Sequence, residues 1–397
     1  MEPKHRMPSD YSNLTGNWNY PNSIKAGAGT IKDLPAHCKA LGMSSPLLIT
    51  DPGLAALPMT QNCVEHCRAT GLNCAVFSEI KLNPTDKNVS DGVVAYKAGG
   101  HDGVIAFGGG SGLDVAKAVA LMVGQDRPIF DFEDVGDNWT RVDTSGVAPV
   151  IAVPTTAGTG SEVGRASIIT DEANHVKKII FHPSMLPELA ILDPELTVSL
   201  PAHITAATGM DALSHNLEAL CSPFYHPMAE GIAIEGIRIV KDYLPRAVAD
   251  GSDLEARIQM LVASSMGATA FQKGLGGMHA LAHPLGALYD AHHGLLNAIL
   301  MPYVLKLNRK AIETRVTRLA CYLALKNPSF DSFLQWVLDL REQVGIPNDL
   351  SGIGIPEKDL ALIGTMASED PSAGGNPITL SPAQYTDLCR NALHGTL

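Results

Sequence analysis

Basic residues, paired cysteine motifs and long apolar runs are all scarce in this chain of 397 residues. Lys and Arg number 29 against 41 Asp and Glu, so the formal net charge is −12 at pH 7. Nucleic acids and anionic membrane surfaces attract basic patches, and the charge balance therefore argues against both. The expected partner is a small molecule, with no nucleic acid and no membrane.

Disulfide bonds, membrane spans and a signal peptide are not expected either. The seven cysteines form an odd set without a CxxC pair, which is typical of reduced thiols in the cytoplasm. Cys63 and Cys67 are four residues apart and could face one another on a helix, but packing in a core is the simpler interpretation. No run of about 18 apolar residues occurs, and the polar N-terminus lacks a signal-peptide core. We therefore predict a cytoplasmic protein with a poorly ordered arm at residues 1–22.

The length and the apolar pattern predict two domains, at 23–200 and 201–397, because single cores stop growing beyond about 250–300 residues. Short runs rich in Val and Ile recur in the first half, at 46–50, 74–78, 103–108, 149–156, 167–170 and 177–181. Helix-period segments such as 54–70 and 111–123 lie between several of them, which is typical of helices around a mostly parallel sheet. Stretches rich in Ala, Leu and Met then predict an all-helical second half.

Two glycine-bearing loops follow predicted strands. The segment GVIAFGGGSGLDVAK (103–117) ends a buried run in three glycines and starts a helix with Ser111 at its expected N-cap. Free N–H groups and the positive end of the helix dipole attract a phosphate there. The run matches neither GxGxxG nor the P-loop pattern, so a tight turn that needs glycine is the alternative. A second such loop, PTTAGTGSE (154–162), adds hydroxyl groups, and two loops at consecutive strand ends favour a dinucleotide.

Asp51 follows the first predicted strand of this half. A carboxylate at that place can accept a hydrogen bond from the 2′-hydroxyl of an adenosine ribose, and it repels a 2′-phosphate. If the two loops hold a dinucleotide, Asp51 favours NAD over NADP.

One aspartate and several histidines predict a metal site in the second half. Asp211 and His215 stand four apart in a predicted helix, so their side chains project from one face. His279 and His283 repeat this spacing, and His293 follows fourteen residues after His279. One carboxylate and three imidazoles suit Fe(II) or Zn(II) and leave room for a substrate oxygen. The spacing alone leaves open that these pairs are capping or surface contacts.

These motifs resemble those of the iron-dependent (group III) alcohol dehydrogenases, which include lactaldehyde reductase and propanediol dehydrogenase. The resemblance rests on GAGTIKDL (27–34), LNP (82–84), GGGSGLDVAK (108–117), PTTAGTGSE (154–162), DP (193–194), TGMDALSHNLEA (208–219) and GMHALAHPLGALYDAHHG (277–294). It covers the chain from about residue 25 to 305, and the remaining helices match only in general character. It implies a dehydroquinate synthase-like two-domain architecture, an α/β N-terminal nucleotide-binding domain and an all-α C-terminal metal-binding domain, with the active site between them.

The resemblance also implies roles for individual residues of the helical half. The implied ligands of the metal, iron or alternatively zinc, are Asp211, His215, His279 and His293. His283 would lie beside the metal as a catalytic proton relay, with buttressing or packing as the alternative. Phe271 would line the substrate pocket, with a core aromatic as the alternative. His292 is left facing solvent or packing.

The cofactor contacts that the resemblance implies lie in the first half. Pyrophosphate contacts are implied at Gly109, Gly110 and Ser111, adenosine and ribose contacts at Asp51 and Asn83, and nicotinamide-side contacts at Asp114, Thr155, Thr156, Thr159 and Lys177. Enzymes of this kind are usually homodimers or larger homo-oligomers, which is expected here by analogy alone.

The predicted activity is hydride transfer between NAD(H) and a small primary alcohol or aldehyde, with the metal polarising the substrate oxygen. No cluster of Arg or Lys accompanies the candidate ligands, which favours a neutral substrate over a phosphorylated one. An NAD-using, metal-dependent lyase or cyclase on the same fold is the nearest alternative, and its motifs match less well. A non-catalytic nucleotide-binding or metal-storage protein is the other alternative.

Overall fold

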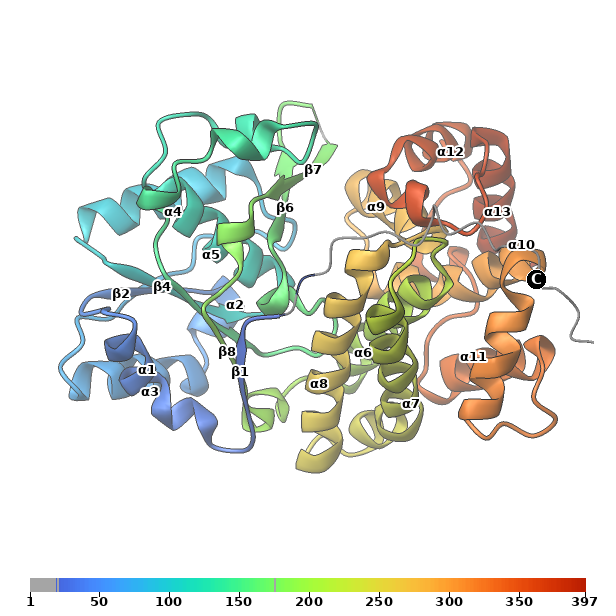
Figure 1. The fold of residues 1–397 in the computed structure, drawn as a ribbon, viewed down its shortest axis with the longest axis horizontal. Coiled ribbons are helices and arrows are strands. Elements are labelled where there is room, and N and C mark those ends of the chain that lie inside the picture. Colours follow the sequence, from blue (N-terminus) through green and yellow to red (C-terminus); the bar gives the residue numbers. More distant parts are fainter. Residues whose placement is uncertain (1–18, 20, 175) are drawn as a thin grey trace, which may run out of the picture.

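A computed structural model describes residues 19, 21–174 and 176–397. It contains an α/β region and a helical region that lie side by side (Figure 1). This arrangement confirms the predicted fold class. The arm predicted at 1–22 lies almost entirely outside the described residues.

The α/β region is built on a six-stranded sheet in which every pair of neighbours is parallel. In spatial order the strands are β1 (Ser23–Ala26), β8 (Leu189–Leu192), β5 (Val150–Pro154), β4 (Gly103–Gly108), β2 (Pro46–Ile49) and β3 (Ala75–Phe77). Successive side chains of a strand point to opposite faces. In β4, Val104 and Ala106 therefore pack into one core, while Ile105 and Phe107 pack into another. Burial on both faces explains why this strand is continuously apolar.

Helices cover both faces of this sheet. The core on one face includes side chains of α4 (Asp86–Ala98) and α5 (Gly110–Met122), and the core on the other includes side chains of α1 (Leu34–Ala40) and α3 (Pro58–Ala69). The single helix predicted at 54–70 is wrong, because a short α2 (Pro52–Ala55) precedes α3. Proline at the first helical position starts α3, since its missing N–H has no partner in a helix there.

The cysteines of the first half serve as core side chains. Cys38, Cys63, Cys67 and Cys74 are all buried in the core beneath α1 and α3. All seven cysteines of the chain are free thiols. Packing, and not a disulfide between Cys63 and Cys67, is thus confirmed as their role.

Two predicted strands leave the main sheet. β6 (Ala166–Asp171) and β7 (Val176–Phe181) pair with one another in antiparallel fashion, so their expected place in the parallel sheet is wrong. Burial alternates along β6, as in a sheet with only one covered face. The sequence patterns also do not predict β1, an exposed edge strand whose residues SIKA carry little apolar signal.

The helical region shares one core. Its α-helices are α6 (Ala202–Cys221), α7 (Pro227–Ala249), α8 (Leu254–Ala270), α9 (Gly277–Tyr289), α10 (His293–Tyr322), α11 (Phe330–Gln343), α12 (Leu360–Glu369) and α13 (Pro382–His394). Among the helices that the structure describes, none is long and apolar enough to cross a bilayer.

The loop after β5 (154–162) joins the two regions. A Cβ atom added to Gly158 would lie 2.9 Å from Cβ of Thr208 in α6, so only glycine allows this close approach. The hydroxyl of Ser265 in α8 donates to the buried carboxylate of Glu162 at 2.6 Å. The carboxyl end of β5 therefore rests directly on the helices of the second region.

Candidate metal centre and cofactor-binding loops

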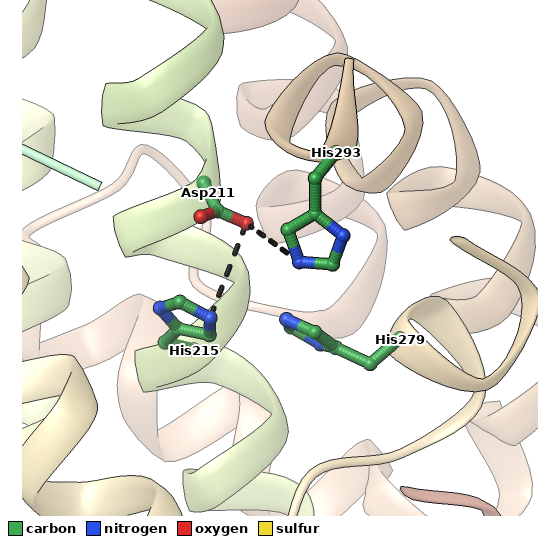
Figure 2. Close-up of side chains that lie close together, drawn as sticks. All are labelled: Asp211, His215, His279 and His293. Atoms are coloured by element: carbon green, nitrogen blue, oxygen red, sulfur yellow. Dashed lines mark ion pairs between the residues drawn. The ribbon is translucent and has the colours of Figure 1, made fainter. Parts of the chain in front are cut away.

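The four predicted metal ligands converge inside the helical region (Figure 2). α6 carries Asp211 and His215, α9 carries His279, and His293 is the first residue of α10. One potential ligand atom from each side chain lies within 4.8 Å of the others. Asp211 Oδ1 is 4.0 Å from Nε2 of His215 and 3.7 Å from Nε2 of His293. Three helices thus bring one carboxylate and three imidazoles together.

The chemistry of this cluster fits a divalent cation. Asp211, His215 and His279 are buried, and the His293 side chain is 30% exposed. Desolvation and the neighbouring imidazoles lower the pKa of His279 and His293 well below the usual value, so both rings are neutral with lone pairs available. A buried carboxylate among neutral rings needs a compensating positive charge. Fe(II) or Zn(II) would supply it with ligands that both metals accept.

Glu218 orients the ring of His279 toward the other three residues of the cluster. Its carboxylate lies 2.6 Å from Nδ1 of His279 and accepts from the backbone N–H groups of Gly276 and Met278 at 2.8 and 2.7 Å. Burial raises the pKa of Glu218 to about 7 although these N–H groups oppose the shift. Because Nδ1–H donates to the carboxylate, the lone pair of Nε2 is left for a metal.

His283 is paired with an acidic residue from the last part of the chain. Its Nδ1 lies 2.8 Å from Oδ2 of Asp370, and its ring stacks on that of His293 with centroids 5.4 Å apart. Burial would raise the pKa of Asp370, but His283 and the N–H of Ser372 lower it below the usual value. The Asp370 carboxylate therefore fixes this ring, and no hydrogen bond from another described residue engages its Nε2.

Two further aromatic residues flank the cluster. Phe271 contacts the ring of His215 edge-on, with centroids 5.2 Å apart. His292 is the N-cap of α10, where its Nδ1 accepts from the N–H of Leu295 at 3.3 Å. His292 thus serves a helix end, next to a residue of the cluster but outside it.

The two glycine-bearing loops contact one another. β4 ends at Gly108, whose φ of 143° favours glycine, and Gly109 is the N-cap of α5. A Cβ atom on Gly110 would lie 2.6 Å from the side chain of Thr159 in the second loop. The backbone N–H of Thr155 donates to Gly108 at 2.9 Å. The loops after neighbouring strands β4 and β5 thus form one glycine-lined surface at a helix N-terminus, which suits a phosphate.

Ser111 and Asp51 have local roles at this edge. The predicted N-cap at Ser111 is wrong by two residues, since α5 begins at Gly110 and the Ser111 hydroxyl donates to the carbonyl of Leu82 instead. Asp51 is the N-cap of α2 and accepts from the N–H of Leu54 at 2.9 Å. Only Oδ1 of Asp51 makes this bond, so Oδ2 can serve another donor.

The remaining predicted cofactor residues form two groups. Asp114 accepts from the Ser161 hydroxyl at 2.6 Å and from the Ile168 N–H at 2.9 Å, so it ties α5 to the second loop and to β6. Lys177 of β7 donates to Asn83 at 2.8 Å, and Asn83 donates to Asp290 at the end of α9. Asn83 and Lys177 therefore lie together where the α/β region meets the end of α9. Thr156 lies against Gly109.

Comparison with known proteins assigns the chain that carries the glycine-bearing loops and the Asp and His cluster to one family. The family model "Iron-containing alcohol dehydrogenase" matches residues 21–194, and the model "Fe-containing alcohol dehydrogenase family, C-terminal" matches residues 205–393. The chain belongs to the iron-containing alcohol dehydrogenase family. The resemblance given by the sequence motifs is thereby confirmed.

Similar members of the iron-containing alcohol dehydrogenase family span the whole chain. A 4-hydroxybutyrate dehydrogenase of Cupriavidus necator is 38% identical, over 94% of this chain and 99% of its own. An NAD-dependent methanol dehydrogenase of Bacillus methanolicus is 34% identical, over 95% of this chain and 100% of its own. A crystal structure of a 1,3-propanediol oxidoreductase superposes with a TM-score of 0.90 at 32% identity, over 95% of this chain and 99% of its own.

Membership of this family confirms the predicted reaction class, NAD-linked oxidoreduction of an alcohol and aldehyde pair. These similar proteins are named dehydrogenases or an oxidoreductase, so they give no support to the alternative of a lyase or cyclase on the same fold. The cluster of one aspartate and three histidines lies in the helical half, which the C-terminal family model matches.

Three polar residues around the cluster of Asp211, His215, His279 and His293 were not predicted from the sequence. Glu218 lies seven residues after Asp211 on the same face of α6, and this spacing could have identified it. Asn297 lies one helical turn after His293 in α10. Asp370 gave no usable signal, because 87 residues separate it from His283.

Proposed function

We propose that this protein is a cytoplasmic, metal-dependent dehydrogenase that interconverts a small neutral primary alcohol and its aldehyde with NAD(H). The observation that carries the proposal is the convergence of Asp211, His215, His279 and His293 in the helical region, where the loop after β5 packs against α6. Fe(II) is the proposed metal, with Zn(II) as the alternative occupant. 4-Hydroxybutyrate, methanol and 1,3-propanediol, named for the relatives, each carry a primary hydroxyl group, and of the three only 4-hydroxybutyrate also carries a charge.

Each group of residues has its own proposed role in the reaction. Asp211 and the three histidines would hold the cation, which would supply Lewis-acid polarisation of the substrate oxygen. Glu218 keeps Nε2 of His279 turned to the cluster. Gly109, Gly110 and Ser111 are the proposed pyrophosphate contacts, with Thr155, Thr156 and Thr159 on the facing loop.

Asn83 and Lys177 are proposed to serve one and the same part of the dinucleotide, because they are hydrogen-bonded to each other. Asp114 is proposed to act on the cofactor through the second loop, which its bond to Ser161 positions. Phe271 packs on His215 and is proposed to line the substrate side of the centre. A homodimer or larger assembly is proposed by analogy with such enzymes.

The activity is tested by following absorbance at 340 nm when a panel of small aldehydes is added to the protein and NADH. We expect NADH consumption with one or more neutral aldehydes, its loss after treatment with a strong chelator, and its recovery on adding Fe(II) or Zn(II). The reverse assay uses the matching primary alcohols with NAD. Full activity in a chelated sample shown to be free of metal would refute a metal-dependent reaction.

Asp51 is proposed to select NAD through charge. Within the described part of the chain no hydrogen bond engages its Oδ2, so the carboxylate can bind a ribose hydroxyl and repel a 2′-phosphate. Asp51→Asn keeps an N-cap side chain but removes the charge, and we expect its ratio of kcat/KM for NADPH to that for NADH to rise roughly tenfold to several hundredfold. Steady-state kinetics with both cofactors measure this ratio. A wild-type preference for NADPH would contradict the assignment.

His283 is proposed to relay the proton of the substrate hydroxyl. The relay is supported by its place beside His279 and His293 and by the Asp370 carboxylate that fixes Nδ1. His283→Ala should keep stoichiometric metal and lose about 10²- to 10⁴-fold in kcat, the usual contribution of a general acid or base. Metal analysis and the kcat pH profile test it together. Loss of metal in this variant would instead make His283 a structural support.

A further inference from the structure

Lys117 is a charged side chain in the interior of the α/β region, and the proposed reaction gives it no role. It lies on α5, and its side chain is 1% exposed. Its neighbours Val115, Ala116, Ala118 and Val119 belong to the apolar core on that face of the sheet. Lysine is almost never fully buried unless it is paired. The contacts of its ammonium group should therefore show why it is there.

These contacts hold the segment that leads from the second glycine-bearing loop into β6. Nζ of Lys117 donates to the carbonyl oxygen of Ala166, the first residue of β6, and lies 3.3 Å from Oδ1 of Asp114. The Asp114 carboxylate in turn accepts from the Ser161 hydroxyl at 2.6 Å and from the Ile168 N–H at 2.9 Å. The two side chains together fasten both ends of this segment to α5.

The position of this segment affects the glycine-lined surface. A Cβ atom on Gly164 would lie 3.5 Å from Nζ of Lys117, so the segment passes close to the ammonium group. Thr159, at the other end of the loop, accepts from the N–H of Ser161 at 3.3 Å and packs against Gly110. A shift of the segment away from α5 would therefore change how Thr159 faces Gly110.

The charge of Lys117 also offsets that of a carboxylate near the proposed pyrophosphate contacts. Asp114 follows Gly110 by four residues, which is about 6 Å along the axis of α5. Its side chain is only 15% exposed, so solvent screens its charge poorly. Burial lowers the pKa of Lys117, and the carboxylates of Asp114 and Glu162 oppose this shift. Without the ammonium group, Asp114 would repel a pyrophosphate at the start of α5.

We propose that Lys117 is a positioning residue for the dinucleotide, which neutralises Asp114 and holds the second glycine-bearing loop against the first without touching the cofactor. This rests on the cofactor-binding loops of the proposed function. The buried side chain cannot reach a ligand, so it acts through Asp114 and the loop. An ion pair that only stabilised the fold would have no specific effect on dinucleotide affinity.

The test titrates the full chain with NADH in the absence of substrate and follows the fluorescence of NADH. Lys117→Met keeps an unbranched side chain and removes the charge, so Asp114 is left unpaired. We expect the Kd for NADH to rise at least about tenfold, because one partner of a buried ion pair has lost its compensation. Metal affinity, measured by competition with a chelator, should stay near that of the wild type.

The double variant Asp114→Asn/Lys117→Met shows whether Lys117 acts through Asp114. It leaves neither charge unpaired, so it should bind NADH more tightly than Lys117→Met does. The effects of the two substitutions on NADH affinity should be non-additive by roughly two- to a hundredfold. Lys117→Met should also cause no further loss when it is added to Asp114→Asn, a comparison that holds even if Lys117→Met alone does not fold. A further loss of tenfold there would overturn the proposal.

Lys273→Met is the matched control. Lys273 is also a buried lysine, 2% exposed, and its Nζ lies 2.8 Å from Oε1 of Glu230 in the helical region. This variant should unfold at a lower denaturant concentration than the wild type and keep its Kd for NADH. The proposal is overturned if Lys117→Met binds NADH like the wild type, or if Lys273→Met weakens NADH binding equally. A wild type that binds no NADH would instead refute the cofactor site of the proposed function.

Discussion

Replacing His279 with alanine is expected to remove both the bound metal and the turnover. Its Nε2 faces Asp211, His215 and His293, and its Nδ1 is committed to Glu218, so its loss removes one of the four proposed ligands. Loss of an orienting outer partner alone typically costs 10- to 100-fold in metal affinity, so loss of a ligand should cost at least about a hundredfold. Metal content per chain after dialysis and kcat with the best aldehyde measure the two effects.

The matched control for this variant is His292→Ala, one residue before the proposed ligand His293. His292 caps α10 and makes no contact assigned to the cluster, so its loss should cost about 1 kcal/mol of stability or less. Metal content should stay near that of the wild type. The ligand assignment fails if His279→Ala keeps both full metal occupancy and full activity.

The proposed metal ligands were accessible to sequence reasoning because their spacing is short and helical. Asp211 and His215 stand one turn apart, and the motif around His279 and His293 fixes a second pair of places. The convergence of α6, α9 and α10 was not visible in that spacing, since it depends on packing of one large core. From the sequence, only the resemblance to a family indicated that Asp211 and His215 share one site with His279 and His293.

The residues that support the ligands were harder to predict. Asn297 and Glu218 look like ordinary polar residues in helices, and only their contacts show why they are buried. Asp370 comes from the last part of the chain, where the motifs gave no match. A side chain that acts through another one leaves no periodic signal, because its position depends on tertiary contacts.

In the α/β half, too, features that depend on tertiary contacts could not be predicted from the sequence. Runs such as 46–50 and 103–108 predict strands because burial on both faces makes them continuously apolar. The pairing of β6 with β7 did not follow from their composition, since Val and Ile suit parallel and antiparallel neighbours alike. Apolar patterning therefore identified most strands, while contacts between distant segments decided which of them are neighbours.

Glu218→Gln is expected to weaken metal binding by roughly 10- to 100-fold and to lower the free energy of unfolding of the metal-free protein by about 1–3 kcal/mol. In the structure two carboxylate oxygens serve three donors, the N–H groups of Gly276 and Met278 and Nδ1 of His279. Glutamine has one acceptor oxygen, so in either orientation its amide N–H group faces a donor. If it faces His279, the ring takes the tautomer with Nε2–H, which cannot bind a metal.

Competition with a chelator measures metal affinity, and denaturant unfolding of the metal-free protein measures stability. Glu188→Gln is the control, because Glu188 also bonds a backbone N–H, that of Val150 at 2.7 Å, but lies in the α/β region. It should lose some stability and keep the metal affinity of the wild type. If Glu218→Gln loses only stability, Glu218 supports the start of α9 and not the metal. If its metal affinity falls while Glu188→Gln binds normally, the carboxylate sets the tautomer on which the centre depends.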